Sequence, residues 1–184
     1  MLKKGIYIYP GGLKVIPGSL NVEDIINVDT SNLSKIISNL NSDFVFIDSA
    51  AGLGREALAS LSVADEVLVV TNPDVPSVTD ALRAIKVAER IGKKIDGIVL
   101  NRVGRARNEL KKLDVESFLS YPVIAQVPED SWVLKSINER IPLVLLNPNS
   151  KAAIEIQNLA FAIIGSKYRI RQSFIDKLFS WIRI

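Results

Sequence analysis

The chain has 184 residues, 48% of them hydrophobic, and a formal net charge of +3. This composition excludes a disordered polar tail and a collagen-like chain, and the length suits one ordinary domain. Cysteine and histidine are both absent, which excludes a disulfide framework, a thiol nucleophile, a Ser-His-Asp triad and a zinc site built on soft ligands. Carboxylates remain as metal ligands, and they favour a hard ion such as Mg²⁺.

The basic charge is concentrated at the C-terminus. Residues 167–184 hold five cations and one anion, a net charge of +4, so the other 166 residues carry −1. Nucleic-acid binding is therefore not expected of the body of the chain. No run approaches the roughly 18 consecutive apolar residues of a spanning helix, and the N-terminal apolar stretch is too short for a secretory signal. The sequence predicts a cytoplasmic protein.

The first third of the chain contains a hairpin signal, a helix and an apolar strand. Short β-like runs at 6–9 and 13–16 flank Pro10-Gly11-Gly12, which favours a hairpin. Asp29-Thr30 is a possible cap for a helix with apolar positions at helical spacing from Leu33 to Leu40. Residues 43–48 then form an apolar run of the length of a buried strand.

Helices and strands alternate from residue 49 onward. After a glycine-containing turn, we expect a helix over 55–61, a strand over 66–71 and a helix over 77–90 that stops at Gly92. There follow a strand over 95–101, a basic loop, a helix over 104–119, a strand over 123–127, and helices over 132–138 and 150–164. This alternation predicts an α/β fold, with a mainly parallel sheet covered by helices on both faces. Ligands of such sheets bind beyond the carboxyl ends of the strands.

Two candidate residues follow the predicted strand over 43–48. Asp48 is placed to accept hydrogen bonds from water bound to Mg²⁺, and Gly52 allows the backbone to approach a phosphate. An equally good interpretation is that Asp48 or Ser49 caps the helix that follows.

The same turn also matches a dinucleotide-binding fingerprint. Gly52, Gly54 and Ala57 fit G-x-G-x-x-[GA], and Asp74 lies about twenty residues later. A single match of this kind is weak, because four residues separate Ile47 from Gly52 where the fingerprint normally follows its strand at once.

Asn101 and Arg102 close the predicted strand over 95–101. An Asn side chain can read an adenine edge, and an Arg side chain can stack on a ring or contact a phosphate. Asn is also a common turn residue at strand ends.

The C-terminal segment carries a wide apolar face with interspersed cations. On a helical projection its apolar members are Phe174, Ile175, Leu178, Phe179, Trp181 and Ile182, and its cations include Arg171, Lys177 and Arg183. This pattern favours a helix that lies in the interface of an anionic membrane. A final helix that docks on the body or on a second subunit is the alternative.

Several longer motifs together resemble the MinD branch of the ParA/MinD ATPases. They are residues 43–57, 64–74, 77–80, 97–103 and 124–130. The resemblance implies a P-loop NTPase-like three-layer sandwich that forms a homodimer around ATP and Mg²⁺. It also implies binding to the inner face of the cell membrane, with protein regulators of cell division contacting the helix over 77–90.

The resemblance further implies roles for single residues. Asp48 would serve the Mg²⁺ site and Gly52 the switch loop. Asn101, Arg102, Pro128 and Asp130 would border the adenine.

The sequence departs from the family in its phosphate-binding segment. The family usually has Pro where this chain has Ala50, and the 184 residues contain no G-x-x-x-x-G-K-[ST]. We therefore expect residues 1–166 to form an N-terminally incomplete MinD-like domain, followed by a membrane-targeting tail at 167–184. The missing P-loop strand would leave apolar strands unpaired.

Little or no ATPase activity is expected from these residues alone, and their capacity to bind ATP and Mg²⁺ is open. The alternative function is a non-catalytic, membrane-associated regulatory or binding module derived from the same fold. A dinucleotide-binding enzyme is a distant third.

Overall fold

The computed structural model describes residues 5–9, 12–17, 33–49, 52 and 54–165. The chain divides into two compact units, residues 1–46 and 47–184. In the first unit, β1 (Tyr7–Ile8) pairs antiparallel with β2 (Lys14–Val15), and Tyr9 N donates to Leu13 O at 2.8 Å across the turn. The first unit also contains α2 (Leu33–Ser38). The predicted hairpin and helix are confirmed, whereas the possible cap at Asp29-Thr30 lies outside the described residues.

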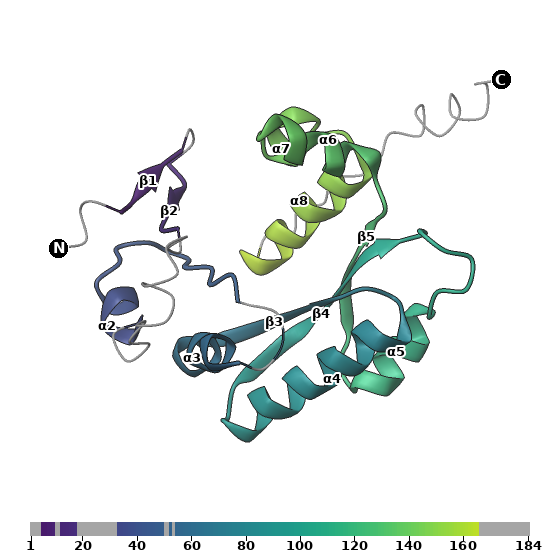
Figure 1. Cartoon of the computed structure of the whole chain (residues 1–184), viewed down its shortest axis with the longest axis horizontal. Coiled ribbons are helices and arrows are strands. Elements are labelled where there is room, and N and C mark those ends of the chain that lie inside the picture. Colours follow the sequence, from purple (N-terminus) through teal and green to yellow (C-terminus); the bar gives the residue numbers. More distant parts are fainter. Residues whose placement is uncertain (1–4, 10–11, 18–32, 50–51, 53, 166–184) are drawn as a thin grey trace. The chain divides into compact units, whose positions relative to one another are not determined.

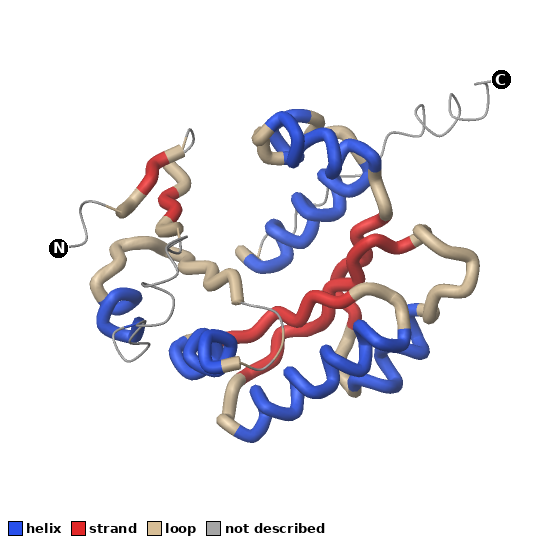
Figure 2. Tube along the Cα trace, viewed as in Figure 1, coloured by secondary structure: helices blue, strands red, loops and turns tan. Residues whose placement is uncertain are grey.

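A parallel sheet forms the centre of the second unit (Figures 1 and 2). Its strands are β3 (Glu66–Thr71), β4 (Lys94–Val103) and β5 (Val123–Pro128), in the order β3-β4-β5. Both neighbouring pairs are parallel. The predicted α/β fold with a parallel sheet is therefore confirmed.

Helices cover both faces of this sheet. On one face α4 (Val75–Arg90) and α5 (Lys112–Leu119) pack over Ile98 and Leu100 of β4. On the other face α7 (Leu143–Leu146) and α8 (Lys151–Ile163) pack over Val99, and α6 (Ser131–Glu139) contacts α7. Because side chains alternate along a strand, neighbouring residues of β4 enter two separate cores.

Local signals position the helices close to where the sequence predicts them. Asp74 caps α4 by accepting a hydrogen bond from Ser77 N at 2.9 Å, and Gly92 follows the helix with a φ of 73°. Ser150 caps α8 in the same way. Lys93 Nζ donates to Ser62 O and Ala64 O at 2.8 Å each, so the end of α3 (Arg55–Val63) is tied to the start of β4.

The strand predicted over 43–48 is wrong. These residues form an irregular segment in which Phe44 and Phe46 are 52% and 77% exposed. A strand needs a hydrogen-bonded neighbour, and no described strand pairs with this segment. In the described part of the chain β3 pairs with β4 alone, and Val70 of β3 is exposed. The apolar run at 43–48 and the outer edge of β3 thus both lack a paired strand among the described residues.

The helix predicted from Gly104 is also too long, because α5 begins only at Lys112. Residues 104–111 form a loop that folds around the Glu109 carboxylate, which accepts hydrogen bonds from backbone N–H groups of the same loop. β4 correspondingly runs two residues beyond its predicted end, to Val103. In the described ranges, no helix has the length and apolar character needed to cross a membrane. The predicted tail at 167–184 lies outside those ranges.

Candidate functional site

Polar residues lie at the ends of the three parallel strands, at the same edge of the sheet. Asn72 comes directly after β3, Arg102 is the second-to-last residue of β4, and Glu129 comes directly after β5. Because the strands are parallel, their carboxyl ends meet at this edge, which is where α/β sheets bind ligands.

Arg102 and Glu129 join the ends of β4 and β5. The guanidinium donates from Nε to Glu129 Oε2 at 2.8 Å and from Nη2 to Oε1 at 3.2 Å, and Glu129 N donates to Val103 O at 2.9 Å. Arg102 has a φ of 60°, in the left-handed region that non-glycine residues rarely adopt. The Arg102 hydrogen bond and charge lower the pKa of Glu129. The pair therefore stays ionised and holds the guanidinium plane in one orientation.

The loop after β4 is shaped by Glu109. Its Oε2 and Oε1 atoms accept hydrogen bonds from Gly104 N and Ala106 N, both at 2.7 Å, and these backbone contacts lower the pKa of Glu109. Leu110 N donates to Pro73 O at 2.9 Å, which ties the loop to the connection between β3 and α4. Two connections that are distant in the sequence thus form one wall.

These two connections enclose a pocket of ≈ 200 Å³. It is lined by Asn72, Pro73, Asp74, Arg102, Arg105, Ala106 and Glu109. An amide, two guanidinium groups and two carboxylates offer both hydrogen-bond donors and acceptors, and a guanidinium plane can stack on a flat ring. The arrangement suits a planar heterocycle with polar edges.

Sequence reasoning identified Arg102 but missed most of the other lining residues. Asn72-Pro73 in the sequence indicates a turn. Arg105 and Glu109 lie inside the helix predicted over 104–119, whereas in the structure they belong to a loop. The usable signal was Glu109 itself, since a carboxylate three residues after Ala106 can fold a short loop by accepting its N–H groups.

The other residues predicted to border a base lie near this pocket without lining it. Asn101 precedes Arg102 within β4 and is half-buried, and Pro128 is the last residue of β5, opposite Val103. The carboxylate of Asp130 accepts hydrogen bonds from Trp132 N at 3.0 Å and Ala152 N at 3.1 Å. Asp130 therefore joins the start of α6 to the start of α8, next to the Arg102–Glu129 pair.

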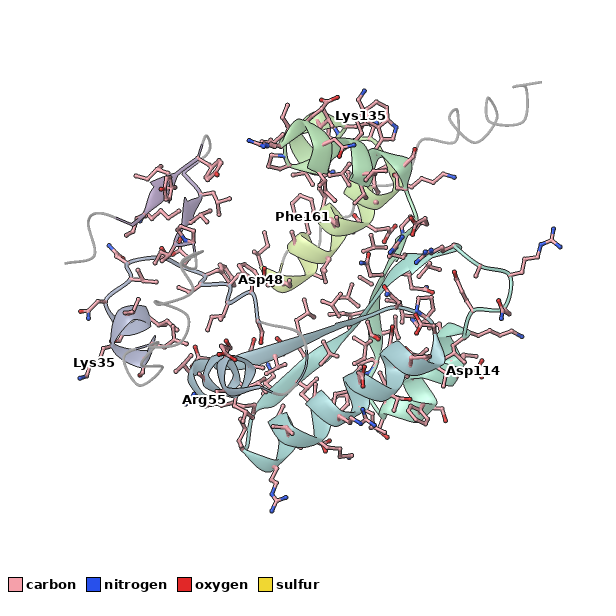
Figure 3. The ribbon with its side chains drawn as sticks, viewed as in Figure 1. Lys35, Asp48, Arg55, Asp114, Lys135 and Phe161 are labelled. Carbon is pink, nitrogen blue, oxygen red and sulfur yellow. The ribbon has the colours of Figure 1, made fainter. Side chains whose placement is uncertain are left out.

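Asp48 and Gly52 are not brought into the pocket. Asp48 is exposed in the irregular segment before α3 (Figure 3), and none of the hydrogen bonds or ion pairs of the described residues involves it. No group of three acidic, Cys or His side chains in the described ranges is arranged to hold a metal ion. A lone exposed carboxylate fits Mg²⁺ only through water and with further ligands such as phosphate oxygens. Their assignment to Mg²⁺ and phosphate stays a prediction.

The dinucleotide fingerprint lacks its structural context. No strand among the described residues leads into Gly52, and the Asp74 carboxylate, three residues after β3, caps α4. The structure therefore gives this interpretation no support.

Comparison with known proteins reveals related sequences and folds. No protein-family profile matches the chain. It is 36% identical over 183 residues to an uncharacterized ATP-binding protein of Methanocaldococcus jannaschii. The matched region covers 96% of this chain and 69% of that protein. The cell division ATPase MinD of Pyrococcus furiosus superposes with a TM-score of 0.82 at 32% identity, over 88% of this chain and 69% of that one. The septum site-determining protein MinD of Pyrococcus horikoshii, solved with Mg-ADP, superposes with a TM-score of 0.83 at 30% identity, over 91% and 72%.

Proposed function

Because the chain belongs to the MinD-like branch of the ParA/MinD ATPase family, we propose that it holds the base of an adenine nucleotide at the strand-end pocket. The single observation that carries this proposal is the convergence of Asn72, Arg102 and Glu129 from three parallel strands on one edge. Two relatives support the same ligand class, since one is named as an ATP-binding protein and another was solved with Mg-ADP.

The pocket residues can divide the recognition of the base among them. Arg102 presents a guanidinium whose plane is fixed by Glu129, and a fixed plane loses little freedom when a ring stacks on it. The Asn72 side chain supplies one donor and one acceptor for the edge of the ring. Asn101, Pro128 and Asp130, which lie beside the pocket, would complete its border.

The phosphate side of the site is less complete in these residues. We propose that Asp48 and Gly52 serve Mg²⁺ and phosphate once a nucleotide is bound, with the ion supplying charge neutralisation. The 184 residues contain no G-x-x-x-x-G-K-[ST] loop, so the backbone cradle and the lysine that P-loop proteins place on phosphates are not supplied by them. We therefore propose little or no hydrolysis by this chain alone.

The cellular role follows from the family. We propose action in division-site placement at the inner face of the cell membrane, through the tail at 167–184, with a homodimer and protein regulators as partners. The net charge of −1 outside the tail supports a role without direct nucleic-acid binding. A non-catalytic, membrane-associated regulatory module is the second candidate, and the missing phosphate loop favours it.

Titration of the ¹⁵N-labelled full chain with ADP and Mg²⁺ tests the base site. We expect amide signals of residues 72–74 and 102–109 to shift, and Arg102→Ala to weaken binding about tenfold, because the guanidinium that stacks on the ring is lost. Arg83→Ala is the matched control, since Arg83 is also exposed and paired with a carboxylate, that of Asp80. Equal affinity of the two variants, or shifts confined to other residues, would contradict the proposal.

The same preparation tests catalysis. ATP turnover should stay at the background rate. Measurable turnover that is lost on Asp48→Ala would show that the chain hydrolyses ATP unaided, and the non-catalytic alternative would then be excluded.

A further inference from the structure

The outer surface of α6 and α7 carries an apolar patch that no described residue covers. The patch consists of Leu134, Ile137, Ile141 and Leu145, which are 64%, 65%, 41% and 65% exposed. Leu134 and Ile137 are three residues apart on α6, Ile141 follows the left-handed Arg140 that ends this helix, and Leu145 lies on α7. Such a stripe of aliphatic side chains normally has a partner.

The chain itself contains a segment that matches this patch. Residues 171–184 place Phe174, Leu178 and Trp181 at i, i+4, i+7, so a helix there would present an apolar stripe. We propose that the C-terminal residues 171–184 dock on the α6–α7 patch when no membrane is present. The membrane and the patch then compete for one apolar face.

The length of chain after α8 allows this return. α6 and α7 lie over the first part of α8, and α8 leads away from them (Figure 1), so docking on the patch would require the following residues to return along α8. Figure 3 shows the two ends of this path, with Lys135 on α6 and Phe161 near the end of α8. The 13 residues of α8 rise about 20 Å. The six residues 165–170 span about 20 Å when extended, which leaves residues 171–184 to lie on the patch.

The charges around the patch indicate an apolar contact. Lys135, Glu139 and Arg140 border it with a net charge of +1, and Lys135 is already engaged by Glu139 at 3.7 Å and by the Trp132 ring at 4.5 Å. A tail of net charge +4 is therefore not attracted by charge. Docking should depend on Phe174 and Leu178, whereas binding to anionic lipid should depend on Lys177 and Arg183 as well.

Disulfide trapping in the full-length chain tests the proposal, and the chain's lack of cysteine removes any background. The test pair is Ile137→Cys with Leu178→Cys. The control pair is Leu113→Cys with Leu178→Cys, because Leu113 is 75% exposed on α5, on the opposite face of the sheet. We expect the test pair to form an intramolecular disulfide at least about tenfold faster, and vesicles of anionic lipid to slow it, since docking and lipid binding exclude each other.

Three results would overturn the proposal. The first is an equal trapping rate for the two pairs. The second is trapping that gives only dimers and rises with protein concentration. The third is loss of test-pair trapping when Lys177→Glu and Arg183→Glu are introduced together. Dimers would assign the patch to a second copy of the chain.

A second measurement does not depend on crosslinking. Ile137→Asp should raise the affinity for anionic vesicles several-fold, because an undocked tail is fully available, whereas Leu113→Asp should leave it unchanged. Both side chains are exposed, so neither change removes a core contact. Equal vesicle affinities for the two variants would contradict docking.

Discussion

At the scale of single residues, the exposed side chains of the strand-end site orient one another through hydrogen bonds. The Arg102–Glu129 pair is solvent-accessible, and such pairs contribute little to stability. Their hydrogen bonds nevertheless fix which way the guanidinium faces. Arg102 was predictable because it closes an apolar strand. Glu109 was not, because its role depends on a loop conformation that helical spacing concealed.

The Glu109 loop should loosen in acid. In the folded chain, hydrogen bonds from backbone N–H groups lower the pKa of Glu109 below 4.5, the ordinary value of a Glu side chain. The stabilisation by the carboxylate is therefore present above pH 4.5 and is lost as the pH falls through the lowered folded pKa. Amide chemical shifts of Gly104 and Ala106, followed against pH, should change with a midpoint below 4.5.

Two variants complete this measurement. Glu109→Gln should abolish the pH-dependent change, and Glu139→Gln, an exposed helical carboxylate outside the loop, should leave it intact. A midpoint at or above 4.5 would show that the two N–H contacts do not hold the ionised side chain.

At the scale of helices and strands, local signals were sufficient where the contacts are local. Asp74 and Ser150 mark the starts of α4 and α8, and the apolar runs of β3, β4 and β5 mark buried strands. The run at 43–48 has the same composition, yet it forms no strand, because pairing depends on a neighbour and not on the run itself. Sequence pattern alone cannot report whether that neighbour exists.

Gly97 tests how tightly the strands are joined. It lies where the register between β3 and β4 shifts, with a φ of 152°. A Cβ there would lie 2.7 Å from Ile124 Cγ2 and 3.0 Å from Pro122 O. Gly97→Ala should therefore lower the free energy of unfolding by about 2 kcal/mol or more, through crowding and backbone strain.

Urea unfolding measures this effect, and Gly5→Ala is the control. A Cβ at Gly5 meets nothing within 4 Å, so that change should stay within about 0.5 kcal/mol. If the two variants unfold at the same urea concentration, the close approach of β4 and β5 at Gly97 is not a constraint.

At the scale of the whole molecule, the second unit is built on a parallel sheet of β3, β4 and β5. The sequence predicted the parallel sheet and the position of the ligand edge, because both follow from the alternation of strands and helices. It could not predict the division into residues 1–46 and 47–184, which depends on contacts between distant segments.

The tail should bind anionic membranes through both its charges and its apolar face. Lys177→Glu with Arg183→Glu, or Phe174→Asp with Leu178→Asp, should weaken co-sedimentation with anionic vesicles at least about tenfold, since each basic residue near the surface contributes about 1 kcal/mol. Lys35→Glu, an exposed lysine on α2, serves as the control. Unchanged co-sedimentation of the tail variants would indicate that the tail binds protein only.

Photolabelling with 8-azido-ADP tests the central claim most directly, because covalent capture records even weak binding at the base. We expect label on residues 72–74 or 102–109 that excess ADP prevents when it is present during irradiation, and that Arg102→Ala reduces. Label on residues 52–57, or label that excess ADP does not prevent, would contradict a base site at the carboxyl ends of β3, β4 and β5.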